Sequence, residues 1–364
     1  MRCSILRRLA ARATPAHWFF VAILAASPAA AQTTPGSRVA DGFARPALTE
    51  LATSAETLAG AVEALCQEPG QPALDAARNA FAETIGHWGR ASVLRFGPLA
   101  AENRFERIFF WPDPRGIALR QVQQVLAQKD ESAATAEGVA GKSVALQGLP
   151  ALEFALHGTG SEALATAEGG FRCSYGAAVA GNVANVVRDV LAGWEADRPF
   201  VVSFTQPAAG TEPYRSDSEV NGEIIKALGT VFQYVRAAEL LPPLGEEAAK
   251  ANGRRAPLWR SDLSFRLMAA QIEGARDLLG FAGYEDTLPE DMRWVADSVT
   301  FELDNALRML AQIENPAEQA FKDEEDRGRL AVVNLSLDHA GHLVSEQLSA
   351  ALGLTMGFNA LDGD

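Results

Sequence analysis

Two histidines near the end of the sequence have a spacing that suits a metal ion. His339 and His342 are three residues apart, and Glu346 follows four residues after His342. On a helix these side chains lie within about one quadrant, so with a further ligand they could hold zinc or iron. The same residues also suit the solvated flank of an amphipathic helix. The sequence leaves both interpretations open.

A glutamate and a histidine one helical turn apart form the second candidate. Glu153 and His157 lie in a short apolar segment that Pro150 opens and Gly158 closes, as is typical of the first turn and the end of a helix. The two side chains would share a helix face, where they could bind one cation or hydrogen-bond each other. Alternatively, Glu153 forms a structural ion pair, and a protonated His157 is stabilised by the dipole at the helix C-terminus.

The third candidate is the aromatic and proline-rich segment 103–116. Its prolines fix the backbone, and Asp113 and Arg115 project charges from it. The composition predicts a rigid loop. Either Asp113 and Arg115 line a ligand pocket, or the loop fills the space between helices and is held there by ion pairs.

Other catalytic signatures are absent from the sequence. It contains no H-E-x-x-H, nucleophile elbow, phosphate-binding loop or dinucleotide-binding glycine pattern. The 46 acidic and 32 basic residues give a net charge of −14, which repels nucleic acid. We therefore expect no nucleic-acid partner. The cofactor stays unknown, with iron and zinc as the candidates.

Residues 1–31 have the composition of a secretory signal peptide. Four arginines precede an apolar stretch from Trp18 to Ala26, and small residues up to Ala31 suit cleavage. Removing those four arginines and no acidic residue changes the net charge from −14 to −18. The apolar stretch is shorter than the ~20 residues of a membrane-spanning helix. We expect a periplasmic or secreted protein, cleaved near Ala31, without a membrane span.

Two cysteines, Cys66 and Cys173, remain after such cleavage. Disulfides persist in oxidising compartments, so this pair predicts a bridge; two buried free thiols are the alternative. The bridge would join the end of one predicted helix to the start of another, and it would restrict the unfolded chain.

Helical periodicity over most of the chain predicts an all-α protein. Between Leu48 and Cys66, apolar residues recur every three or four positions, as on one face of an amphipathic helix. Further helices are predicted at 72–96, 116–130, 142–157, 173–193, 217–240, 261–279, 288–313 and 328–352. Only 107–111 and 200–204 have a strand-like composition.

A segment without periodicity divides the predicted helices into two sets. Residues 204–216 are rich in proline and glycine, which favours a linker. Since each helix has one apolar face to bury, we predict two packed helical bundles, at 40–204 and 216–364.

Four segments spread over the chain are similar to segments of one known family. They are RFGP (95–98), RIFFWPDPRG (107–116), QGLPALE (147–153) and GFNALDGD (357–364). Taken together they resemble the imelysin-like family of exported bacterial proteins. The resemblance implies two helical bundles and a periplasmic or outer-membrane-associated role in iron uptake. The implied partner is an iron-uptake protein or an outer-membrane receptor.

One position departs from the pattern of that family. Members often carry G-x-H-x-x-E, whose histidine and glutamate are proposed metal ligands of a peptidase. Here Gly148 and Glu153 match, but Pro150 occupies the histidine position and has no ligand atom. His157 follows one turn later, on the other side of Glu153.

The resemblance and this departure together favour a non-catalytic binding or accessory protein of iron acquisition. Its groove would lie between the bundles around Glu153, Asp113 and Arg115, where carboxylate oxygens would suit ferric iron. The alternatives are a metallopeptidase with a degenerate motif and a purely structural partner of an outer-membrane receptor.

Overall fold

The computed structural model describes residues 33–354. Helices make up most of this part of the chain, and none of it lies in a β-strand. The all-α prediction is therefore confirmed. The predicted signal peptide (1–31) and the segment 357–364 lie outside the described residues.

The longer helices are α2 (Arg45–Gln67), α3 (Gln71–Ala91), α6 (Ile117–Gln128), α8 (Leu149–His157), α9 (Gly170–Ala192), α11 (Asp217–Tyr234), α13 (Ser264–Ala282), α15 (Trp294–Leu310) and α17 (Glu324–His342). The shorter ones are α1 (Pro35–Val39), α4 (Gly97–Ala100), α5 (Arg104–Ile108), α7 (Ala136–Ala140), α10 (Pro199–Thr205), α12 (Leu241–Leu244), α14 (Tyr284–Thr287), α16 (Ala317–Ala320) and α18 (Ser349–Ala351). Three segments are π-helical: Ala40–Ala44, Val235–Leu240 and Leu343–Leu348.

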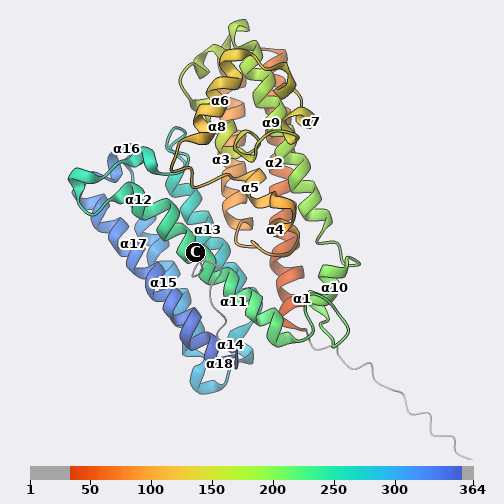
Figure 1. Cartoon of the computed structure of the whole chain (residues 1–364). Coiled ribbons are helices and arrows are strands. Elements are labelled where there is room, and N and C mark those ends of the chain that lie inside the picture. The colour runs from red at the N-terminus through yellow and green to blue at the C-terminus, as the bar shows by residue number, and fades with distance from the viewer. Residues whose placement is uncertain (1–32, 355–364) are drawn as a thin grey trace, which may run out of the picture. The chain divides into compact units, whose positions relative to one another are not determined.

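The first group of helices is built around α2. This helix contacts α3 and α9, and α8 contacts both α3 and α9 (Figure 1). Leu51, Leu58 and Leu65 on α2 are buried, seven residues apart, so that they lie on one side of the helix as its apolar periodicity predicts. The helix ends at Gln67, one residue before Pro69 and Gly70.

The second group consists of α11, α13, α15 and α17. Helix α15 packs along α17, α13 contacts α15, and α11 contacts both α13 and α17 (Figure 1). The α15–α17 contact includes a side-chain hydrogen bond in which Asn305 Nδ2 donates to Ser336 Oγ at 2.9 Å, and His339 Nδ1 lies 3.5 Å from Glu302. Each group buries apolar faces in the way that a helical bundle requires.

The two groups join where α3 packs on α13, a contact we call the junction. Two glycines allow the helix backbones to approach: a Cβ on Gly89 would lie 3.0 Å from the Leu267 oxygen, and one on Gly274 would lie 2.3 Å from the Arg90 oxygen. An ion pair between Arg90 and Asp277, at 2.8 Å, crosses the same contact. The prediction of two packed helical bundles is confirmed, while the residue limits 40–204 and 216–364 stay a prediction.

The predicted limits of two helices are wrong. The helix predicted at 72–96 already ends at Ala91. The helix predicted at 142–157 begins only at Leu149, after a 3₁₀ turn at Val144–Leu146, because Pro150 favours the first turn of a helix. As the all-α prediction requires, neither strand-like run forms a strand: 200–204 lies within α10, and 107–111 spans the end of α5 and the loop after it. Residues Phe200 and Phe204 pack in an aromatic cluster with Trp194, and this tertiary packing outweighs local strand propensity.

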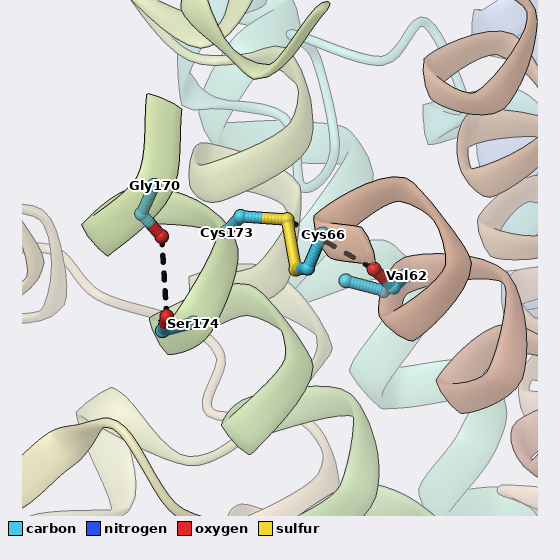
Figure 2. The surroundings of a disulfide bond; sticks show 5 residues. All are labelled: Val62, Cys66, Gly170, Cys173 and Ser174. Carbon is cyan, nitrogen blue, oxygen red and sulfur yellow. Dashed lines mark hydrogen bonds between the residues drawn. A yellow bond between two sulfur atoms is a disulfide. The ribbon is translucent and has the colours of Figure 1, made fainter. Parts of the chain in front are cut away.

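The predicted disulfide is present in the structure. Figure 2 shows Cys66 at the end of α2 bonded to Cys173 in the first turn of α9, across a sequence separation of 107 residues. The bond therefore ties the ends of two neighbouring helices of the first group. Within residues 33–354, no helix is both long and apolar enough to cross a membrane.

Candidate functional site

The segment 147–153 leads into α8 and packs against the C-terminal end of α5. A Cβ on Gly148 would lie 2.4 Å from the Ile108 oxygen, so only glycine fits this close backbone approach. Next to it, Arg107 Nε donates to Gln147 Oε1 at 3.1 Å. The structure thus brings together the 103–116 and 147–153 segments, which are about forty residues apart in the sequence.

Glu153 is buried on α8, with 3% of its surface exposed. Its Oε1 accepts hydrogen bonds from the backbone N–H groups of Arg260 and Ser261, at 2.9 and 3.0 Å, and from the Ser261 hydroxyl at 3.1 Å. Its Oε2 lies 3.9 Å from the Arg260 guanidinium. Burial raises the pKa of Glu153, while these hydrogen bonds and the Arg260 charge act in the opposite direction.

The donors to Glu153 belong to a tight turn before α13. Leu258 and Asp262 have positive φ values of 55° and 58°, a conformation that non-glycine residues rarely adopt. The Arg260 guanidinium lies over the Trp259 ring, 4.4 Å from its centroid. Glu153 thus fastens the turn of the second helix group to α8 of the first, and three donors already occupy its Oε1.

His157, at the last position of α8, has a different environment. Its ring lies against Phe81 of α3, with the ring centroids 5.7 Å apart, and its Nε2 is buried without a hydrogen-bond partner among the described residues. Burial, with a smaller effect of the Arg78 charge, lowers the pKa of His157 to about 4. Burial thus disfavours the protonated His157 that the helix C-terminus would stabilise.

Two arginines, rather than a protonated histidine, supply the positive charge at the C-terminus of α8. Arg78 Nε donates to the Leu156 oxygen at 2.9 Å, and Arg172 donates to the oxygens of Phe154 and Ala155, each at 3.2 Å. These cations satisfy the last carbonyl groups of α8 and complement its dipole.

Asp113 and Arg115 lie on the loop before α6. Asp113 accepts hydrogen bonds from the backbone N–H groups of Ile117 and Ala118, each at 2.8 Å, as an N-terminal helix cap does. Arg115 is exposed, and its backbone oxygen accepts a hydrogen bond from the Arg120 side chain. Both carboxylate oxygens of Asp113 are thus engaged by the helix that follows them.

The same loop reaches across to the second helix group through Trp111. Its indole Nε1 donates to the Ala238 oxygen, and its own backbone oxygen accepts from the Tyr234 hydroxyl, both at 3.0 Å. Close by, the Arg95 guanidinium lies 3.8 Å from the centroid of the Phe105 ring, a cation–π arrangement. Of the two interpretations of this segment, the structure displays the contacts that hold a loop between helices: the hydrogen bonds of Trp111 and an ion pair between Glu106 and Arg95, at 3.0 Å.

The histidine pair of the last long helix lies on the surface. His339 Nδ1 is 3.5 Å from Glu302 of α15, and His342 Nδ1 is 3.2 Å from Glu346. The side chains of His339, His342 and Glu346 are all more than half exposed. Within residues 33–354, no group of three or more His, Cys, Asp or Glu side chains is placed to hold a metal ion.

A hollow of about 400 Å³ opens beside the junction, where α2, α3 and α13 meet. It has charges of both signs: the lining includes Glu50, His87 and Arg90 from the first helix group and Arg266 and Glu273 from the second. The Glu50 carboxylate lies 2.8 Å from Arg90 and 3.6 Å from His87. The sequence did not single out any of these residues, because charged side chains on amphipathic helices are ordinary.

Sequence reasoning also missed the residues that hold Glu153. Arg260 and Ser261 lie more than one hundred residues after it, in a segment with no periodicity and no recognised motif. The apolar neighbours of Glu153 were the one available signal, because a carboxylate among them needs a buried partner.

Fold and site together define an all-α protein in which two helix groups pack at the junction and are also fastened to each other by a buried carboxylate and a tryptophan. The family model for imelysin (Peptidase_M75) matches residues 44–342. The chain therefore belongs to the imelysin family.

Solved structures share this fold at low sequence identity. An imelysin-like protein from Psychrobacter arcticum 273-4 has 21% identity and a TM-score of 0.70, covering 89% of this chain and 96% of its own. A protein described as an iron-regulated protein A precursor, from Parabacteroides distasonis ATCC 8503, has 13% identity and a TM-score of 0.66, covering 85% of this chain and 94% of its own. Among curated proteins, no sequence matches.

Proposed function

We propose that this imelysin-family chain is a periplasmic, non-catalytic binding or accessory protein of bacterial iron acquisition. The observation that carries the proposal is the pair of positions 150 and 153 on α8. Pro150 stands where the family motif has a histidine, and it offers no ligand atom. Glu153, the other motif position, has its Oε1 occupied by Arg260 and Ser261.

The residues at the motif do not fit the metal that the family motif implies. A catalytic zinc site uses three protein ligands and an open position for water. Here Pro150 replaces the histidine of the motif. The glutamate of the motif, Glu153, is hydrogen-bonded to the turn that precedes α13. His157 does not complete the set, since it lies against Phe81.

A binding role needs a concave surface and polar groups that converge on it. The hollow beside the junction supplies both, since Glu50, His87 and Glu273 alternate there with Arg90 and Arg266. The iron context rests on the family resemblance and on the name of the P. distasonis protein with the same fold. Export to the periplasm rests on the composition of residues 1–31.

The first experiment compares metal binding and peptidase activity in the wild-type protein and Glu153→Ala. Elemental analysis and calorimetry with ferric, ferrous and zinc ions would be followed by incubation with casein. We expect neither protein to cleave casein with any of these ions. We also expect Glu153→Ala to bind the same amount of each metal as the wild-type protein. Zinc-dependent cleavage that Glu153→Ala abolishes would overturn the non-catalytic assignment in favour of a metallopeptidase.

The iron and export parts of the proposal are tested in the native bacterium. A deletion strain should grow poorly under iron chelation, and the full-length chain should restore growth. A chain lacking residues 2–31 is the matched control and should fail to restore growth, because it is not exported. Normal growth of the deletion strain under chelation would contradict the role in iron acquisition.

A further inference from the structure

The second helix group contains a carboxyl group that no part of the proposed site uses. Glu239 lies in the π-helical segment Val235–Leu240 that continues α11, and its exposed fraction is 0%. Its Oε1 accepts a hydrogen bond from Nε2 of Gln271 at 3.1 Å. Gln271 lies on α13, is 1% exposed, and follows Ala270, which contacts α3 at Gly89.

Each of these two side chains has one oxygen left without a donor. Among the described residues, no hydrogen-bond donor reaches Glu239 Oε2 or Gln271 Oε1. Buried oxygens of this kind are rare in folded proteins, because they give up hydrogen bonds to water. The two oxygens belong to side chains that one hydrogen bond already joins.

A single proton would satisfy both oxygens. A protonated carboxyl group has one O–H donor, and an amide oxygen is an acceptor. If Glu239 Oε2 carries the proton, it can donate to Gln271 Oε1 while Gln271 Nε2 donates to Glu239 Oε1, which closes a ring of two hydrogen bonds. The ionised carboxylate has only acceptors and leaves both oxygens unsatisfied.

We propose that Glu239 is a neutral carboxylic acid in the folded protein at pH 7, and that its pair with Gln271 is a pH-sensitive latch between the π-helical segment and α13. When the proton is lost, the latch holds a buried and uncompensated negative charge. The device is independent of the function proposed above.

The surroundings of Glu239 favour the neutral form. Burial raises the pKa of Glu239 to about 8, and the hydrogen bond from Gln271 opposes this only in part. Ionisable groups on the packed elements are few or already paired. Arg236 of the same segment pairs with Asp338 of α17, and the Tyr234 hydroxyl of α11 donates to the Trp111 oxygen.

The other contacts of the segment bring no compensating charge to Glu239. Helix α12 consists of leucine and proline, and from α13 the partner of Glu239 is Gln271. The charge of Arg95 lowers the pKa of the neighbouring Tyr234, and the charge of Glu106 raises it. Neither charge contributes to the shift in the pKa of Glu239. An ionised Glu239 would therefore lack a counter-ion among the described residues.

The latch predicts a specific dependence of folding stability on pH. The folded pKa of about 8 lies above the ordinary value of 4.5, so between these values the unfolded chain has released a proton that the folded chain keeps. The folding equilibrium constant then falls tenfold per pH unit from about pH 4.5 to about pH 8, and the effect levels off above that.

The test compares the wild-type protein with Glu239→Gln, in which an amide nitrogen permanently supplies the donor. Urea unfolding of both proteins from pH 5 to pH 10 gives the ratio of their folding constants. We expect the ratio of wild type to Glu239→Gln to fall tenfold per pH unit up to about pH 8 and then to stay constant. A ratio that is constant from pH 6 to pH 10 would overturn the proposal.

Infrared spectroscopy detects the same proton directly in the folded wild-type protein. We expect a carbonyl band of a protonated carboxyl group at pH 7 that disappears with a midpoint near pH 8. Because burial also raises the pKa of Glu153, Glu153→Gln is the matched control, and it should retain the band. Absence of the band at pH 7, or its loss in Glu153→Gln, would show that Glu239 is ionised.

Discussion

Replacement of Glu153 by alanine is the most informative perturbation of this protein. The carboxylate accepts hydrogen bonds from two backbone N–H groups of the turn that precedes α13. The substitution would remove the acceptor and leave the donors on Arg260 and Ser261 in place. Because Glu153 is also the remaining acidic position of the family motif, one substitution separates a structural role from a ligand role.

The magnitude follows from the groups left unsatisfied. The Ser261 hydroxyl can still donate to the Leu258 oxygen, 3.0 Å away. The two backbone N–H groups lose their acceptor, and each unsatisfied donor costs about 1–3 kcal/mol of stability. The desolvation that raises the pKa of Glu153 is relieved at the same time, which offsets part of this loss. We expect Glu153→Ala to lower the free energy of unfolding by about 3 kcal/mol, within the range for breaking a buried pair.

The assay is urea unfolding of the oxidised protein, followed by far-ultraviolet circular dichroism. Glu153→Gln should lose only about 1 kcal/mol, because its amide oxygen still accepts from both backbone N–H groups. Glu318→Ala is the surface control: its ion pair with Arg254 is exposed, so the change should be about 0–1 kcal/mol. A loss below about 1 kcal/mol in Glu153→Ala, combined with loss of iron or zinc binding, would refute the structural role.

Three further predictions concern α6, the disulfide and α8. Asp113→Ala should lower stability by about 1 kcal/mol in urea unfolding, because it removes the cap of α6; an unchanged stability would contradict the capping role. Cys66→Ala combined with Cys173→Ala should lower stability by about 4–5 kcal/mol, since the bridge closes a loop of about one hundred residues. Thiol titration of the unreduced, denatured wild-type protein should find no free thiol; two would contradict the bridge. Relative to His157→Leu, the wild-type protein should lose about 3 kcal/mol between pH 6.5 and pH 4, because the pKa of His157 is about 4 when folded and 6.5 otherwise, whereas the pH dependence from Glu239 is common to both proteins. His157→Leu should lack that acid sensitivity, and an equal loss in the variant would exclude His157 as its source.

Most of the helices could be predicted from the sequence because helical periodicity is a local property. The spacing of Leu48, Leu51, Leu58 and Leu65 indicates α2, and the structure buries all four. The disulfide was also predictable, since an isolated pair of cysteines in a chain that is expected to be exported has few alternatives.

The residues that hold Glu153 could not be predicted in this way. Arg260 and Ser261 reach it from a non-periodic turn more than one hundred residues later. In the same way, His339 is paired with Glu302 on a neighbouring helix rather than with Glu346 on its own. Spacing within one helix shows which side chains share a face, but not which helix covers that face.

The sequence by itself therefore determined the all-α class, the course of the long helices and the cysteine pair, because each depends on local spacing or on residue identity. The tertiary structure decided the environment of each ionisable group. Glu153 is bound to a distant turn, His157 is buried beside Phe81, and Glu239 is paired with Gln271. Burial and hydrogen bonding set the charge state of such groups, and both arise only when the helices pack.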